Sequence, residues 1–268
     1  MALTSTTGVY RVATALVVGF IVLPLVIVVW ASFFSNKILS FPPQGYTLDW
    51  YVRAWSRQEF RDGLILSLKT ALFASAGSLI LGVPASYALA RYRFRGRDVI
   101  TNILLAPMVV PGIVGGAAMY IFYIDIEILT EVQIAGTAPG LYLAHLLVAL
   151  PWTVRLSTAA LIGFDIAISE AAASLGASAT TIFIRIVLPV IRPAIIASAL
   201  FAFVASFIDL EKSLFLVGPG RTTLQIAIMN YLEWNLDSTI AAVAAVQIAI
   251  IATLLLITNR YAQLSRAF

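Results

Sequence analysis

The amino-acid sequence predicts an all-α membrane protein with six transmembrane helices and both termini in the cytoplasm. Of its 268 residues, 61% are apolar and only 11% are charged, whereas a soluble domain carries about 25% charged residues. A bilayer core about 30 Å thick needs roughly 20 helical residues per crossing, so the length accommodates about six spans with short connections. We expect residues 1–268 to form a single transmembrane domain.

Long intervals without charged side chains locate the spans, because a charge at the bilayer centre costs roughly 2.5–3.5 kcal/mol. The spans are expected at about residues 10–34, 63–90, 99–123, 139–162, 194–217 and 237–259. The first is too long for the apolar core of a signal peptide, which has roughly 7–15 residues. The fifth is long enough only if it includes the charged residues Asp209, Glu211 and Lys212.

Orientation follows from the excess of Lys and Arg that cytoplasmic loops carry. With a cytoplasmic amino terminus, the outer loop near 124–138 carries acids without a base. The cytoplasmic bases are then Arg11, Arg91, Arg93, Arg95, Arg97, Arg155, Arg185, Arg192, Arg260 and Arg266, against the acids Asp98, Asp165 and Glu170. The basic balance is too small and too scattered to suggest nucleic-acid binding.

The composition also excludes several chemistries. The chain has no Cys and one His, which excludes disulfides, thiolate metal sites and Cys nucleophiles. The single histidine, His145, lies mid-way along the fourth span, and we expect its side chain to be buried and hydrogen-bonded. The alternative is an intramembrane Ser–His hydrolase, but no G-x-S-x-G turn occurs. No Gly precedes a Lys, so the chain has no phosphate-binding loop and is not expected to be an enzyme or to bind a cofactor or metal.

Proline and glycine interrupt several expected spans. Gly82 and Pro84 fall in the second, Pro107 and Pro111 in the third, and Pro151 in the fourth. In lipid, freed backbone groups need partners, so broken helices belong beside protein or a water-filled path. The third span is therefore the best candidate for a pathway wall. Alternatively, these residues mark close helix packing.

The charges expected within the fifth span are a second candidate for the pathway. Asp209 and Lys212 share a helical face and would neutralise each other, which leaves Glu211 without a partner on this helix. Ionisable residues in a membrane are functional candidates by default. Either Asp209 or Glu211 lines a path or gate for a cation, or the ion pair is a structural brace.

The segment 165–193 is predicted to form two short helices at an angle outside the bilayer. Asp165 or Ser169 caps the first helix, and Gly176 ends it. Pro189 and Pro193 are expected to end the second and to set the entry angle of the fifth span. Two stiff helices rooted in two spans form a lever on which a cytoplasmic partner acts.

This segment resembles the EAA signature, EAA-x3-G-x9-I-x-LP, of the permease subunits of binding-protein-dependent type I ABC importers. Every signature position is met, by Glu170, Ala171, Ala172, Gly176, Ile186, Leu188 and Pro189. The similarity extends to the stretch 82–91 and to Val217-Gly218-Pro219-Gly220. Residues 207–220 most resemble the spermidine/putrescine branch.

The resemblance implies a type I ABC importer permease fold and a coupling role for the seven signature residues. It also implies partners: two cytoplasmic ABC ATPase subunits that bind ATP and Mg²⁺, a second permease subunit (a related chain or a copy), and an extracytoplasmic substrate-binding protein. The expected location is the bacterial inner membrane, in contact with lipid. The expected cargo is a small solute such as a polyamine or other organic cation, with iron, thiamine and amino-acid-like solutes as alternatives.

A different class of function is a secondary transporter or channel that works alone, for which broken helices and membrane acids are sufficient. Such a protein would move solute without ATP or an ATPase.

Overall fold

The computed structural model describes residues 3–38 and 40–264. Within that part of the chain the secondary structure is helical, apart from one isolated β-bridge between Phe34 and Tyr46. Five of its helices are long and apolar enough to cross a membrane, and a bent helix pair over residues 179–207 is a sixth candidate. The predicted all-α membrane fold is confirmed.

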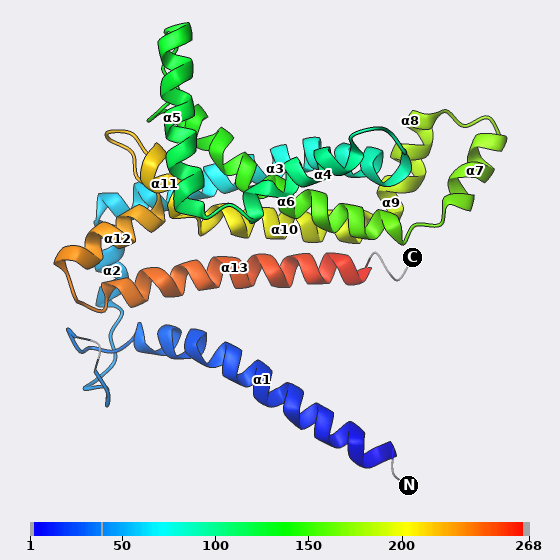
Figure 1. The fold of residues 1–268 in the computed structure, drawn as a ribbon. Coiled ribbons are helices and arrows are strands. Elements are labelled where there is room, and N and C mark those ends of the chain that lie inside the picture. The colour runs from blue at the N-terminus through cyan, green and yellow to red at the C-terminus, as the bar shows by residue number, and fades with distance from the viewer. Residues whose placement is uncertain (1–2, 39, 265–268) are drawn as a thin grey trace. The chain divides into compact units, whose positions relative to one another are not determined.

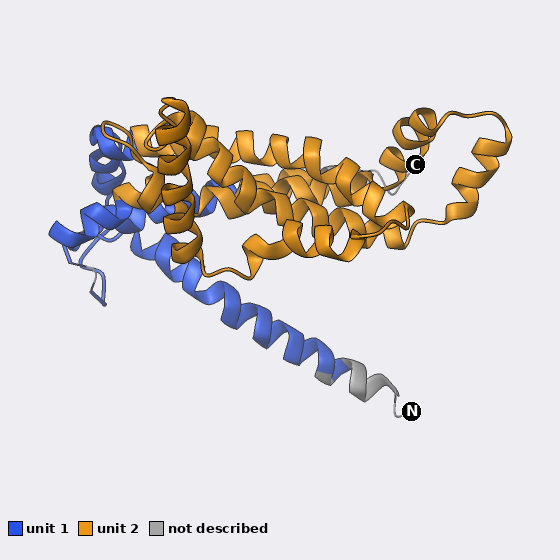
Figure 2. Cartoon of the chain, turned by 45° about the horizontal axis from the view of Figure 1, so that its top comes forward, with its two compact units in different colours: residues 1–61, 228–252 blue, residues 62–227, 253–268 orange. Residues whose placement is uncertain are grey.

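The chain divides into two compact units (Figure 2), residues 1–61 with 228–252 and residues 62–227 with 253–268. The first unit contains α1 (Leu3–Ala31), α2 (Asp49–Ser56), most of α12 (Leu224–Trp234) and the first part of α13 (Thr239–Leu264). The short helix α2 agrees with the amphipathic character of its sequence, and α12 was not expected. A single permease domain over residues 1–268 stays a prediction.

A polar network ties the loops of the first unit together. Asp237, in the turn before α13, pairs with Arg53 of α2 at 3.3 Å and accepts hydrogen bonds from the Tyr231 hydroxyl at 2.9 and 3.0 Å. The guanidinium of Arg57 lies 4.6 Å above the Tyr231 ring. These contacts fix α2 to the end of α12, because charge-assisted hydrogen bonds are roughly twice as strong as neutral ones.

The second unit is a helix bundle with a bent arm. Its helices are α3 (Gln58–Arg91), α4 (Arg97–Leu105), η1 (Ala106–Met108), α5 (Gly112–Thr130), α6 (Ala138–Ile162), α7 (Ile166–Ser174), α8 (Ala179–Ile182), η2 (Phe183–Val187), α9 (Leu188–Val190), α10 (Arg192–Phe207) and α11 (Glu211–Leu216). In Figure 1, α3, α4, α6 and α10 run side by side, α5 turns steeply away from them, and α7 to α9 lie at one end.

Small residues bring α3, α6 and α10 close together. Ala74, Ala149 and Ala202 form a fully buried contact between the three helices. Ser78 and Thr153 share a buried hydrogen bond of 2.9 Å between α3 and α6. Interfaces of this kind are common between membrane helices, because small side chains permit close backbone approach.

Prolines break only one of the three helices in which they were expected to do so. Pro84 and Pro151 lie inside the unbroken helices α3 and α6, so the expected interruptions there are wrong. A proline frees a single helical carbonyl, and neighbouring helices allow this in a packed bundle. The third span does break: Pro107 lies in η1, and Pro111 is the residue before α5.

Two loops of the second unit meet through glycines. A Cβ on Gly218 would collide with the carbonyl of Gly136, and Arg221 Nη1 donates to the same carbonyl at 2.8 Å. The Glu127 carboxylate accepts hydrogen bonds from the backbone N–H groups of Ile134 and Ala135. The connection between α5 and α6 is therefore held against the connection between α11 and α12.

Candidate functional site

The segment that carries the signature residues begins with the predicted capped helix. The Asp165 carboxylate accepts a hydrogen bond from Ala167 N at 2.9 Å and so caps α7. Gly176 has φ +87°, and Ala177 N donates to Ala172 O at 3.0 Å across the helix end. This left-handed turn is the usual reason for a glycine at a helix terminus. The predicted helix cap at Asp165 and helix end at Gly176 are confirmed.

The second helix of the segment ends between Pro189 and Pro193, as expected. α9 extends to Val190, and the turn before it, η2, is a π-helix. Proline has no N–H, and its ring clashes with the carbonyl four residues earlier, a conflict that a wider turn relieves. Pro193 lies in the first turn of α10, and the two helices meet at a bend of 74°.

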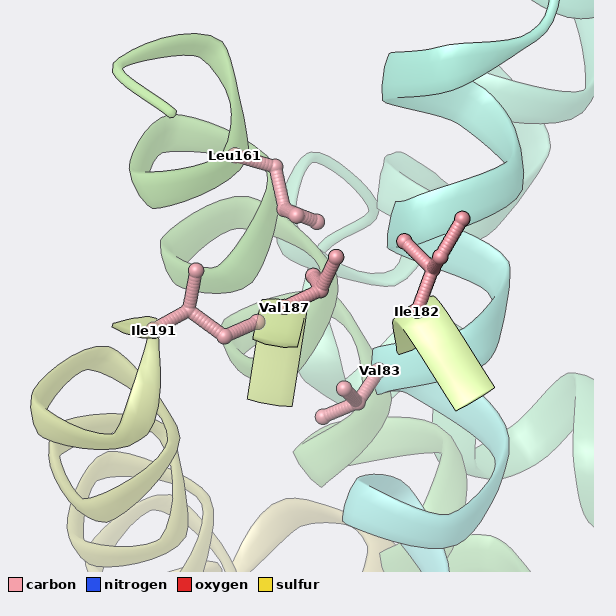
Figure 3. Close-up of a cluster of buried hydrophobic side chains, with 5 residues drawn as sticks. All are labelled: Val83, Leu161, Ile182, Val187 and Ile191. Carbon is pink, nitrogen blue, oxygen red and sulfur yellow. The ribbon is translucent and has the colours of Figure 1, made fainter. Parts of the chain in front are cut away.

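The signature residues divide into an exposed set and a partly buried set. The Glu170 side chain is 67% exposed and only approaches Arg91 Nη2, at 3.9 Å. Ala171, Gly176 and Pro189 are also exposed. Ala172, Ile186 and Leu188 instead pack against a core cluster formed by Val83, Leu161, Ile182, Val187 and Ile191 (Figure 3). One set is thus available to a partner, while the other fastens the segment to α3, α6 and α10.

The same segment also carries exposed apolar side chains. Leu175, beside Gly176, is 89% exposed, and Ile168 and Ile184 are also exposed. Exposed apolar side chains together with an exposed carboxylate are typical of a protein interaction surface.

The second candidate region lies where the fifth span breaks. α10 ends at Phe207 and α11 begins at Glu211, so the charges lie at a joint and not within a continuous helix. The Lys212 ammonium lies 3.4 Å from Asp209 Oδ2 and 3.6 Å from Glu211 Oε2. The expectation that Glu211 has no partner is wrong, because the long side chain of Lys212 reaches its neighbour Glu211 as well as Asp209. The predicted Asp209–Lys212 pair is present.

A cavity of about 220 Å³ lies beside this joint, lined by residues of η1, α4, α5 and α6 and by Lys212. Its wall is apolar except at Lys212, and its members include Pro107, Val110, Met119 and Leu147. Of the residues expected on the pathway, Pro107 lines this cavity. Asp209, Glu211 and Pro111 are not among its lining residues.

Glycines of α5 form the surface on which α11 lies. A Cβ on Gly112 would collide with the Glu211 carboxylate, and a Cβ on Gly116 would lie 2.7 Å from Glu211 O and 2.8 Å from Phe215 Cδ2. Gly116 is therefore required by the close approach of the α11 backbone, whereas the flexible Glu211 side chain could turn away from a Cβ at Gly112.

His145 is buried and hydrogen-bonded, as expected. It is 2% exposed, and its ring lies between two serines: Nδ1 is 2.9 Å from Ser206 Oγ, and Nε2 is 3.1 Å from Ser213 Oγ. Sequence reasoning missed both serines. Their spacing of seven residues, on either side of the charged stretch, would place them on one helix face and was a usable signal.

The described residues contain no group of three His, Asp or Glu side chains placed to hold a metal ion.

The comparison with protein families decides between an importer subunit and a transporter that works alone. The family described as "Binding-protein-dependent transport system inner membrane component" matches residues 78–266. The chain belongs to this family. It is a multi-pass permease of the inner membrane and serves a transport system that depends on a binding protein.

Curated relatives of this permease cover most of its length. It is 29% identical over 247 residues to the spermidine/putrescine transport system permease protein PotC of Haemophilus influenzae. This alignment covers 91% of this chain and 92% of the relative. It is 30% identical over 226 residues to the putrescine transport system permease protein PotI of Escherichia coli K12. This alignment covers 84% of this chain and 80% of the relative.

The fold of the permease is also that of a solved ABC importer. A crystal structure of a bacterial ABC transporter involved in the import of the acidic polysaccharide alginate contains a chain with a TM-score of 0.66 and 17% identity. The similarity covers 98% of both chains.

Proposed function

We propose that this permease imports a polyamine or a similar organic cation, driven by ATP hydrolysis in partner subunits. Two cytoplasmic ABC ATPases with ATP and Mg²⁺, a second permease (a related chain or a copy) and an extracytoplasmic binding protein complete the transporter. The observation that carries the coupling part is the division of the signature segment into an exposed surface around Glu170 and a buried anchor.

The geometry of this segment supports a role in coupling. Glu170, Ala171 and Gly176 are exposed on and just after α7, while Ile186 and Leu188 pack into the cluster shared by α3, α6 and α10. An ATPase that binds the exposed surface therefore applies force to three helices through a close-packed core, and such cores transmit displacement because they deform little.

The orientation follows from the same assignment. If α7 contacts a cytoplasmic ATPase, the arginine-rich turn at 91–97 is cytoplasmic as well, since Arg91 approaches Glu170. The excess of Lys and Arg on this side supports the same orientation. We therefore place both termini in the cytoplasm and regard residues 1–268 as one permease domain.

The cargo is proposed from the relatives and from the charged joint. Both relatives are named for polyamine transport, and Asp209 and Glu211 provide carboxylates beside the cavity that Pro107 lines. We assign Asp209, Glu211, Pro107 and Pro111 to the pathway or its gate. A cation selected there is consistent with intramembrane acids that mark ion and solute paths.

The test of coupling is Glu170→Lys, which reverses the charge of the docking surface without changing the buried anchor. We expect the ATPase to be lost from the purified complex while the permease keeps its thermal unfolding midpoint. Asp98→Lys, which changes another exposed acid on the proposed cytoplasmic side, is the matched control and should retain the ATPase.

Intact ATPase recovery and wild-type transport in Glu170→Lys would contradict the coupling role. Solute uptake into liposomes by the purified chain, with no ATPase present, would instead favour a secondary transporter.

A further inference from the structure

A single side chain joins the two parts of the broken fifth span. Ser206 lies one residue before the end of α10, and Ser213 lies in α11, beyond the break. His145 of α6 bonds to both, at 2.9 and 3.1 Å. All three side chains are buried, so water does not compete for these hydrogen bonds.

The direction of each hydrogen bond follows from the partners. Ser213 Oγ donates to the backbone carbonyl of Asp209 at 3.0 Å and has no second proton to give. His145 Nε2 must therefore donate to Ser213 Oγ. In the neutral ring, Nδ1 is then an acceptor and accepts a hydrogen bond from the Ser206 hydroxyl. The result is a directed chain of hydrogen bonds from Ser206 through His145 and Ser213 to Asp209.

This chain ends at the charged joint. Asp209 pairs with Lys212, and Lys212 provides the charged part of an otherwise apolar cavity wall. On its other side α11 lies against Gly112 and Gly116 of α5, where no side chain intervenes. His145 and the glycines thus hold a short helix of six residues from two sides.

We propose that His145 is a positioning residue for solute translocation: by bonding to a serine on each side of the break, it fixes α11 and so keeps the carboxylates of Asp209 and Glu211, with their partner Lys212, beside the cavity. A helix of this length has no stability of its own, since isolated helices shorter than about 12–15 residues are marginal. The position of α11 therefore depends on these contacts. The role in solute affinity rests on the proposed function, whereas the fixing of α11 does not.

The first arm of the test measures the position of α11 directly. The chain has no Cys, so two can be introduced for spin labels at exposed sites on either side of the break, Phe201 of α10 and Leu214 of α11. Without the two hydrogen bonds, His145→Leu should broaden the distribution of label distances. His145→Gln, whose amide supplies an NH2 donor and an oxygen acceptor, should keep it narrow.

Thr153→Val is the matched control. Thr153 also lies on α6, is fully buried and shares a hydrogen bond with another helix, but it does not contact the break. It should lower the unfolding midpoint about as much as His145→Leu does and leave the label distances narrow.

The second arm measures uptake of putrescine by the complete transporter in liposomes. His145→Leu should raise KM at least about threefold with Vmax within about twofold, whereas His145→Gln and Thr153→Val should keep the wild-type KM. A uniform loss of packing would not separate KM from Vmax in this way.

Unchanged label distances in His145→Leu would overturn the proposal, and so would broadened distances with an unchanged KM. If the wild-type transporter takes up no putrescine, the proposed cargo is wrong, and the label distances alone decide whether His145 fixes α11.

Discussion

Asp209 binds Lys212 twice. Its Oδ1 accepts a hydrogen bond from the backbone N–H of Lys212 at 2.8 Å, and its Oδ2 lies 3.4 Å from the ammonium of the same residue. The first contact holds the start of α11 and needs only an acceptor oxygen. The second is an ion pair and needs the charge, so the two roles can be separated by substitution.

Asp209→Asn combined with Glu211→Gln tests whether the acids serve a cation pathway. The amide oxygen of the introduced asparagine still accepts from the backbone of Lys212, so α11 should form, while both negative charges are lost. We expect putrescine uptake to fall by about tenfold or more, because a cation in the membrane then has no counter-charge.

Asp125→Asn is the control for the double variant, because Asp125 is an exposed acid of α5 away from the joint. This variant should transport putrescine normally. Normal uptake with a lowered midpoint in the double variant would show that the acids only brace the joint.

Gly82→Ala should destabilise the contact between α3 and α6. A Cβ at this position would lie 2.8 Å from Thr153 Cγ2 and 3.1 Å from Thr153 Cβ, and Thr153 is held by Ser78. Overpacking of this kind costs about 1–3 kcal/mol, so the thermal unfolding midpoint should fall. Gly115→Ala is the control, since its Cβ would meet only Val110 Cγ1 at an ordinary 3.7 Å. Equal midpoints for the two variants would refute the packing argument.

Gly176→Ala should weaken ATPase recovery without unfolding the bundle. The φ of +87° places Gly176 in the left-handed region, where a Cβ costs roughly 1–2 kcal/mol. That cost favours other conformations of the exposed turn, so the ATPase should bind several-fold more weakly. Gly176→Asn should lose less, because Asn tolerates this region. Gly163→Ala, at φ −82°, should bind the ATPase normally, and equal binding by all three variants would exclude a role for the turn.

Asp237 should make the stability of the first unit depend on pH. Burial alone would raise the pKa of its carboxyl, but hydrogen bonds from Thr239 and Tyr231 and the charge of Arg53 outweigh burial and lower the pKa below 3.8. A lowered folded-state pKa contributes stability that is present above about pH 4 and is lost as the pH falls through the folded value. Asp237→Asn should therefore destabilise the protein near neutral pH, and the difference from wild type should shrink on acidification toward about pH 3.

The measurement is the unfolding midpoint of both proteins in detergent across that range. Glu233→Gln, at an exposed acid of α12, serves as the control and should follow the wild-type curve. A constant difference between wild type and Asp237→Asn would show that the carboxylate contributes no charge-dependent stability.

Composition and local motifs were sufficient to predict much of the fold. Charge-free stretches gave the all-α membrane class, because the cost of a buried charge is a property of each residue. Asp165 and Gly176 were predictable for the same reason, since a cap and a left-handed turn involve only neighbours in the chain.

Some of the errors concern residues whose state depends on distant partners. Pro151 stays within α6, where it is fully buried by the surrounding structure. Pro84 is exposed on the unbroken helix α3, and Glu211 is reached by the long side chain of its neighbour Lys212, so these two errors have local causes. The two serines at His145 come from sites 61 and 68 residues away, and no local pattern specifies which histidine nitrogen each serine meets.

The contact between Gly136 and Gly218 has a mechanical consequence. Backbone touches backbone there, and Arg221 fastens the crossing from outside. A joint without side chains has no rotamers to absorb a displacement. A rotation of α11 would therefore displace the first turn of α6 directly. A methyl group added at Gly218 would force the Gly136 and Gly218 backbones apart.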